Sequence, residues 1–225
     1  LSSLIQQYLH CKKIYHDAQA RLEQAYDVLM VSELIRHSTR LAGFSPCRGI
    51  NHLKVSDRRE HSAYLRAVSV IEGKHPALMI SRMNETFASV VRQVSSNQLL
   101  LDSRLSLKRN HPLMIADCYH AEIHDCLSIK KSYQGWLVTL KQPLKFHFIA
   151  PYYAGEWLEE QFFIANNTQG ESALFYKTLK AEELTSVING LAAELSAIEG
   201  MDFIRVTLMV LSGKPIILET AIRTP

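Results

Sequence analysis

Glycine is scarce in this chain, at 9 of 225 residues. No two glycines have the spacing of a P-loop, and no three have the spacing of a dinucleotide-binding fingerprint. The G-x-S-x-G motif of α/β-hydrolases and the H-E-x-x-H motif of zinc peptidases are also absent. We therefore do not expect a phosphate site built from glycine backbone, nor any cofactor held in that way.

Long hydrophobic runs are missing as well. The longest unbroken apolar stretches are a handful of residues, whereas a membrane-spanning helix needs about 20. Hydrophobic residues make up 47% of the chain and charged residues 21%, which is ordinary for a globular protein. The composition predicts a folded, soluble protein that makes no contact with a membrane.

Cysteine is too rare for a disulfide scaffold. The four cysteines are Cys11, Cys47, Cys118 and Cys126, and no two of them form a C-x-x-C pair. Four cysteines in a chain of this length are typical of reduced thiols in the cytoplasm. The sequence therefore predicts a cytoplasmic protein without disulfides.

Positive and negative charges are unevenly distributed. Residues 1–150 carry 20 basic and 12 acidic side chains, whereas residues 151–225 carry 5 basic and 10 acidic ones. The basic excess is greatest over residues 36–66. Such a stretch can meet nucleic acid or an acidic partner, although it is more often a solvated surface.

The first forty residues have the pattern of a long helix. Apolar or small side chains alternate steps of four and three residues, as in a heptad seam. They are Leu4, Tyr8, Cys11, Tyr15, Ala18, Leu22, Ala25 and Leu29. The seam is expected to lie on its own domain or to form a homodimer through residues 4–29, and Gly43 ends the helix.

Three β-hairpins and two shorter helices are predicted after this helix. The hairpins are Ala63–Val70 with Ala77–Met83, Trp136–Lys141 with Leu144–Ala150, and Phe203–Leu211 with Pro215–Ile222. One helix is expected over Asn84–Val94, with Asn84 as its N-cap, and another over Ala181–Ile198, which has an apolar stripe and ends at Gly200.

Long hairpins separated by single helices predict an α+β fold, with an antiparallel sheet packed by helices. We expect a single domain over residues 1–225. It comprises the helix over 1–43, the first hairpin and helix over 44–96, and a third portion over 97–225.

The third portion resembles the chorismate pyruvate-lyase family and the related ligand-binding domains of GntR-type regulators. The resemblance rests on Leu100-Leu101-Asp102-Ser103, Trp136-Leu137, Gly170 with Leu174-Phe175, and Leu211 to Glu219. It implies binding of a small anionic, carboxylate-bearing molecule, with or without a lyase activity that needs no cofactor. Glu219 would then be the catalytic carboxylate.

The chain departs from this family where the lyases hold their substrate. The family has an arginine just after the aromatic-Leu pair, and that position here is Val138. The first hairpin instead carries Arg66 and Arg82 on faces that are otherwise apolar. These two arginines are the candidate ligand-binding residues, and the alternative is that each is paired with an internal carboxylate such as Glu72 or Glu85.

A cluster of histidines suggests a different chemistry. On a strand, His120, Glu122 and His124 share one face, and His147 is a candidate third histidine from a neighbouring strand. Two histidines and a carboxylate would suit zinc or non-haem iron. The alternative is that this face of the strand lies in water and binds no metal.

Three classes of function therefore remain open. The first is a small-molecule binding domain, with or without lyase activity. The second is a regulatory or interaction module that dimerises through its N-terminal helix and contacts nucleic acid or an acidic partner. The third is a His/Glu metalloenzyme.

Overall fold

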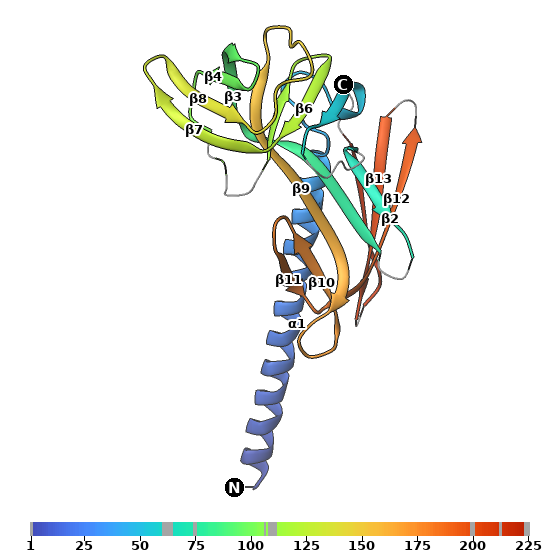
Figure 1. The fold of residues 1–225 in the computed structure, drawn as a ribbon. Helices are drawn as coiled ribbons and strands as arrows, with labels where there is room; N and C mark the ends of the chain where they lie inside the picture. Colours follow the sequence, from blue (N-terminus) through green and yellow to red (C-terminus); the bar gives the residue numbers. More distant parts are fainter. Residues whose placement is uncertain are drawn as a thin grey trace.

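The computed structural model of the chain describes residues 2–59, 65–73, 76–105, 107, 112–198, 201–211 and 213–222. One long helix, α1 (Ser2–Arg40), precedes fourteen strands and a short 3₁₀ turn, Ile50–His52, over these residues. Figure 1 shows the strands gathered in one body and the N-terminal half of α1 projecting from it.

The long N-terminal helix predicted from the sequence is confirmed, and it ends close to the expected glycine. The N–H of Leu41 still bonds to the carbonyl of His37, and Gly43 then takes a positive φ of 69°. A side chain at Gly43 would also collide with the Cβ of Ala67, at 2.7 Å. Glycine is required here because it tolerates both the φ angle and the close approach.

Most strands join one large, strongly bent sheet. Its order is β1-β6-β5-β9-β3-β4-β8-β7, with β2 added to β3, β10 added to β9, and β11 added to β10. The strands are β1 (Lys54–Asp57), β2 (Val68–Ile71), β3 (Ala77–Ser95), β4 (Gln98–Leu101), β5 (Leu113–Ala116), β6 (His120–His124), β7 (Cys126–Ser132), β8 (Gly135–Leu140), β9 (Tyr153–Asn166), β10 (Ser172–Lys177) and β11 (Ala181–Thr185).

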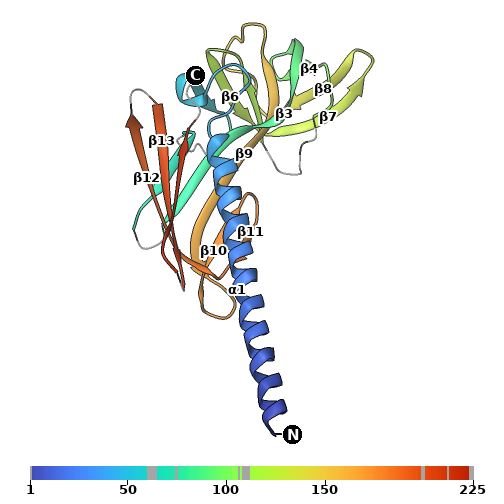
Figure 2. The same ribbon diagram turned by 180° about the vertical axis from the view of Figure 1, so that it is seen from behind.

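The remaining strands form a second sheet of three antiparallel strands. They are β12 (Ile188–Ile198), β13 (Met201–Val210) and β14 (Ile216–Ala221), in that order. This sheet packs against the half of the large sheet that contains β2, β10 and the beginning of β3, as the opposite views in Figures 1 and 2 show. A core of buried side chains lies between the two sheets and the last turns of α1, among them Ile35, Leu78 and Leu208.

The α+β class and the mainly antiparallel pairing are confirmed, but the sheet is larger than expected and is mixed. Strand β1 pairs with β6 in parallel, from Lys54 opposite His120 to Asp57 opposite Ile123. The first and third hairpins are also confirmed in their described residues, since β2 pairs with β3 and β13 pairs with β14. Residues 63–64, 74–75 and 212 of these hairpins lie outside the described residues.

The two shorter helices predicted from the sequence are wrong. The segment 84–94 belongs to β3, where the register against β9 shifts between Met83 and Phe87. The segment 181–198 forms β11 and the whole of β12. In both places cross-strand packing prevails over local helical spacing.

The second predicted hairpin is wrong, because only its first strand forms. Strand β8 pairs with β7 and β4, whereas residues 144–150 form no strand. This segment leads to the cis bond between Ala150 and Pro151. The N–H groups of Lys145 and Ile149 bond to buried carboxylates, and that of Leu144 bonds to the carbonyl of Ser96.

Candidate functional site

The most exposed apolar surface of the molecule lies on α1. Ten large apolar side chains of this helix are each more than half exposed to solvent. They are Leu4, Ile5, Tyr8, Leu9, Ile14, Tyr15, Leu22, Tyr26, Leu29 and Met30. Single exposed apolar residues are common, but a set of this size on one helix is unusual for a chain that stays on its own.

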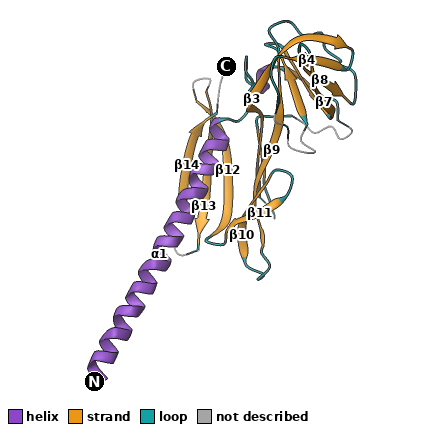
Figure 3. Cartoon of the chain, turned by 90° about the vertical axis from the view of Figure 1, so that its left-hand side faces the viewer, coloured by secondary structure: helices purple, strands orange, loops and turns teal. Residues whose placement is uncertain are grey.

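Most of this apolar surface points away from the protein's own domain. Val31 and Ile35 are buried against the sheets, whereas Leu22 and Leu29 lie almost on the opposite side of the helix. This follows from the helical rotation of about 100° per residue. Figure 3 shows α1 lying along the three-stranded sheet and continuing beyond it.

The predicted seam therefore does not pack on its own domain. Only the C-terminal portion of α1 does so, and Thr185 marks one contact by donating a hydrogen bond of 3.1 Å to Asp27. Every described residue from Ser3 to Asp27 is exposed. The heptad pattern is thus fully available to another chain.

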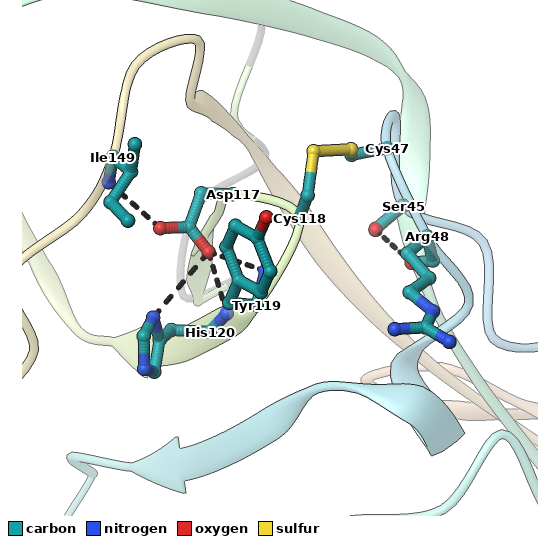
Figure 4. The surroundings of a disulfide bond; sticks show 8 residues. All are labelled: Ser45, Cys47, Arg48, Asp117, Cys118, Tyr119, His120 and Ile149. Atoms are coloured by element: carbon teal, nitrogen blue, oxygen red, sulfur yellow. Dashed lines mark hydrogen bonds and ion pairs between the residues drawn. A yellow bond between two sulfur atoms is a disulfide. The ribbon is translucent and has the colours of Figure 1, made fainter.

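A second cluster of interest surrounds Asp117, at the end of β5. Its carboxylate is almost completely buried and accepts N–H bonds from Tyr119 (2.7 Å), His120 (2.6 Å) and Ile149 (2.8 Å), as Figure 4 shows. Burial alone would raise the pKa of this carboxyl, but the three backbone N–H groups outweigh it and lower the pKa. Asp117 was missed by the sequence reasoning, although a carboxylate directly after the apolar run 113–116 is a usable signal.

Glu122 has a similar role on the neighbouring strand, β6. Its carboxylate accepts N–H bonds from Lys145 (2.9 Å) and Phe146, and Oε2 lies 2.8 Å from Nε2 of His124. Glu122 and His124 are both completely buried, so the prediction that this face of the strand lies in water is wrong. The carboxylates of Asp117 and Glu122 together anchor the segment 144–149.

The four candidate metal ligands are not gathered around one point. His120 is partly exposed and its ring lies 4.8 Å from that of Phe146, while His147 is exposed. Glu122 is occupied by His124 and by backbone N–H groups. Within the described residues, no three His, Cys, Asp or Glu side chains are placed to hold a metal ion together.

The expectation that all four cysteines are reduced is wrong. Cys47 and Cys118 form a disulfide with their Cα atoms 5.1 Å apart, joining the loop after α1 to the β5–β6 turn (Figure 4). Of the other two cysteines, Cys11 is exposed on α1. Cys126 is half-buried, and burial raises the pKa of its thiol.

The two candidate ligand-binding arginines lie in different surroundings. Arg82 is buried, as expected, but its partner is Glu160, reached by both Nε and Nη2 at 3.5 Å. The hydroxyl of Tyr176 also donates to Glu160, at 2.9 Å, and burial together with this carboxylate raises the pKa of Tyr176 well above 10. Arg66 is exposed, so its expected burial is wrong, and it lines a cavity of about 720 Å³.

Glu219, the candidate catalytic carboxylate, lies on the outer face of the three-stranded sheet. It is directly opposite Arg205 in the ladder and accepts a hydrogen bond of 2.7 Å from its Nε. Both side chains are more than half exposed. This is the arrangement of a surface ion pair.

The basic stretch over residues 36–66 is partly neutralised by the fold. Arg36 pairs with Glu33 at 2.8 Å, and Arg59 lies between the carboxylates of Asp57 and Glu159, at 2.6 and 2.9 Å. The sequence reasoning missed both partners of Arg59, of which Asp57 is two residues away and Glu159 is 100 residues away along the chain. The stretch is therefore less basic in space than in sequence.

Comparisons of the chain with protein-family models, with curated proteins and with solved structures found no match. Within the described residues of the chain, no helix has the length and apolar character needed to cross a membrane.

Proposed function

We propose that this protein is an interaction module that associates with other copies of itself through α1. The observation that carries the proposal is the exposed apolar surface of the helix, which faces away from the domain to which α1 is attached. Folding within one chain leaves these side chains in water. Helix packing between chains would bury them, at about 25 cal/mol for each Å² removed from water.

The order of large and small residues favours another copy as the partner. Large side chains at Tyr8, Tyr15, Leu22 and Leu29 recur every seven residues, and small ones at Cys11, Ala18 and Ala25 lie between them. In a parallel, in-register pair the large side chains of two identical helices meet in one set of layers, and the small ones meet in the layers between them. Residues 2–30 carry three basic and three acidic side chains, so two copies would not repel each other.

We also infer that the protein works in an oxidising compartment. The Cys47–Cys118 disulfide joins the loop after α1 to the β5–β6 turn, 71 residues apart along the chain. Disulfides of this structural kind persist outside the reducing cytosol. The inference replaces the cytoplasmic location expected from the cysteine count.

Sedimentation velocity of the full chain at several concentrations tests the association. Leu22→Lys places a charge in the exposed apolar surface, and Gln24→Lys places the same charge on the other side of the helix. We expect the native chain and Gln24→Lys to associate and Leu22→Lys to remain monomeric. A native chain that is monomeric at every soluble concentration, or equal association of both variants, would contradict the proposal.

A second candidate function is the binding of a small anionic molecule at the cavity lined by Arg66. The cavity volume of about 720 Å³ is suitable for a small ligand. Arg66 supplies a positive charge, and Leu53, Val55 and Leu65 supply apolar walls. The lining also includes Asp57, which is paired with Arg59, and Asp202. Titration with benzoate and with inorganic phosphate, followed by NMR, is the test, and Arg66→Met should abolish any binding that is specific for this site.

A further inference from the structure

Three surface cavities follow one another along β12. The first, of about 540 Å³, is lined by residues 189–192, and the second, also of about 540 Å³, by residues 193–195. The third, of about 720 Å³, is lined by residues 195–197. Together they form a groove along almost the whole strand.

The other wall of the groove comes from the large sheet and the loop after α1. Pro76 and Ile164 line the first cavity, Val68 to Val70 line the second, and Ile50 and Val55 line the third. Figure 2 shows β12 at the outer edge of the three-stranded sheet. The groove therefore separates the edge of one sheet from the edge of the other.

Both strands beside the middle of the groove have an unpaired edge. In the described residues of the chain, β12 pairs only with β13, and β2 pairs only with β3. No backbone hydrogen bond links β12 to β2 within those residues. An unpaired edge presents a row of N–H and C=O groups whose natural partner is another extended strand.

We propose that this groove binds an extended peptide segment of another protein, which adds as a strand to the free edge of β12. Main-chain hydrogen bonds would supply affinity, and side-chain pockets along the groove would supply specificity, as in other cases of strand addition. Nine residues of β12 line the groove, which at about 3.3 Å per residue accommodates a segment of about nine residues.

The lining of the groove defines the chemistry of the segment. The cavity at residues 189–192 presents apolar side chains such as Ile164 and Leu191, and the one at residues 195–197 presents Val68 and other apolar side chains beside Asp57 and Asp202. Apolar residues are therefore expected at alternate positions of the peptide. The described residues that line the middle cavity include two acidic ones, Glu72 and Glu194, and one basic one, Arg66. A lysine or arginine at the centre of the segment complements this excess of negative charge.

The probe is a set of three nine-residue peptides of alternating valine and threonine, with Lys, Gln or Glu as the central residue. Binding to the full chain is measured by fluorescence anisotropy, and amide hydrogen exchange locates the contact. We expect the Lys peptide to bind tightest and the Glu peptide weakest, with slowed exchange in residues 188–198 and 68–71. A control peptide with proline at alternate positions cannot donate to the strand edge and should not bind.

Charge reversal within the groove provides the decisive comparison. Glu194→Lys should weaken the Lys peptide about tenfold and strengthen the Glu peptide. Glu85→Lys, an exposed change of the same charge away from the groove, should leave both affinities unchanged. Absence of binding by all three peptides, binding without protection of β12, or an equal effect of both variants would overturn the proposal.

The peptide and the small anion would compete for the third cavity, and the two variants distinguish the two binding proposals. Loss of anion binding in Arg66→Met, with peptide affinity still dependent on the charge at residue 194, supports the peptide groove. Anion binding in the absence of any peptide binding counts against it. Neither result depends on the self-association of α1.

Discussion

Nε2 of His124 lies 2.8 Å from Oε2 of Glu122, and neither side chain is reached by solvent. The other ring nitrogen, Nδ1, has no hydrogen-bond partner among the described residues. A buried lone pair without a partner is less unfavourable than a buried N–H without one, so Nε2 is the nitrogen that carries the proton. The pair thus orients Glu122 towards the N–H groups of Lys145 and Phe146.

Removing the Glu122 carboxylate should loosen the segment 144–149. Glu122→Ala leaves two backbone N–H groups and His124 without their acceptor, and we expect a loss of about 3–5 kcal/mol in the free energy of unfolding. Glu122→Gln keeps one acceptor oxygen and should lose less. Thermal unfolding and amide exchange at Lys145 and Phe146 measure the two effects, and unchanged protection of these amides in Glu122→Ala would refute the assigned role.

Acid should destabilise the fold through the same carboxylates. Burial opposes ionisation of Glu122, but the bonds from His124 and from backbone N–H groups outweigh it and hold its pKa below 4.5, and the pKa of Asp117 is likewise held below 3.8. A group whose pKa is lower in the folded state stabilises the fold above its unfolded pKa and loses this contribution as pH falls through the folded value. Urea unfolding should therefore show stability falling below about pH 4.5.

The double variant Asp117→Asn, Glu122→Gln is the control for this pH dependence. Its stability should be lower at pH 7 and should change less between about pH 5 and about pH 3 than that of the native chain. An equally steep pH dependence in the double variant would assign the effect to other carboxylates.

The Cys47–Cys118 disulfide should contribute about 4 kcal/mol, because it closes a loop of 71 residues in the unfolded chain. Cys47→Ser, Cys118→Ser and the double variant should each lose a similar amount, since each lacks the same cross-link. Urea unfolding with and without a reducing agent measures the loss in the free energy of unfolding. A native chain whose stability is insensitive to a strong reducing agent would show that the cross-link does not stabilise the fold.

The two arginines of the first hairpin should respond differently to the same change. Arg82→Met leaves the Glu160 carboxylate buried without its cation, and we expect a loss of about 3 kcal/mol. Arg66→Met changes an exposed side chain and should alter stability by less than about 0.5 kcal/mol. Chemical unfolding of the two variants side by side provides the comparison, and an equal loss in both would be inconsistent with the burial of only one.

The burial of Arg82 was predictable because Leu78 and Ile80 share its parity on β3, but its partner was not. Glu160 is 78 residues away and meets Arg82 only because β3 and β9 pair antiparallel. Local sequence separation favoured Glu72 and Glu85, which are near only along the chain. The spacing of apolar residues along a strand therefore predicts which side chains are buried. The partner of a buried charged side chain depends on which distant strand pairs with its own.

The false helix over 181–198 has a specific physical cause. The register of β12 against β13 shifts between Ile188 and Gly190, so that Ile188 and Leu191 both face the core although they are three residues apart. A β-bulge thus reproduces helical spacing within a strand. Gly190 was the available warning, because glycine inside a helix is unfavourable by about 1 kcal/mol relative to alanine.

The prediction that Asn84 is the N-cap of a helix is wrong, because Asn84 lies within β3. Its side-chain oxygen accepts the N–H of Thr86 at 3.0 Å, and its amide donates to Glu156 at 2.9 Å. These bonds occupy the irregular stretch of β3, where the register against β9 shifts. The same local chemistry serves a helix N-terminus or a bulge, and only the neighbouring strands decide between them.

The parallel arrangement of two α1 helices can be tested at Cys11, which lies among the small residues of the seam and is exposed. In parallel, in-register helices the two Cys11 thiols face each other, whereas antiparallel packing separates them. A short bismaleimide should therefore join two chains in a Cys126→Ser background, where Cys11 is free and Cys47 and Cys118 are held in the disulfide. Leu22→Lys should prevent the reaction, because it removes the association that brings the thiols together.

Moving the thiol to the other side of the helix, with Cys11→Ser and Lys13→Cys, should also prevent the cross-linking reaction. Association without any Cys11 cross-link would rule out the parallel register, and equal cross-linking from position 13 would show that the seam does not direct the contact.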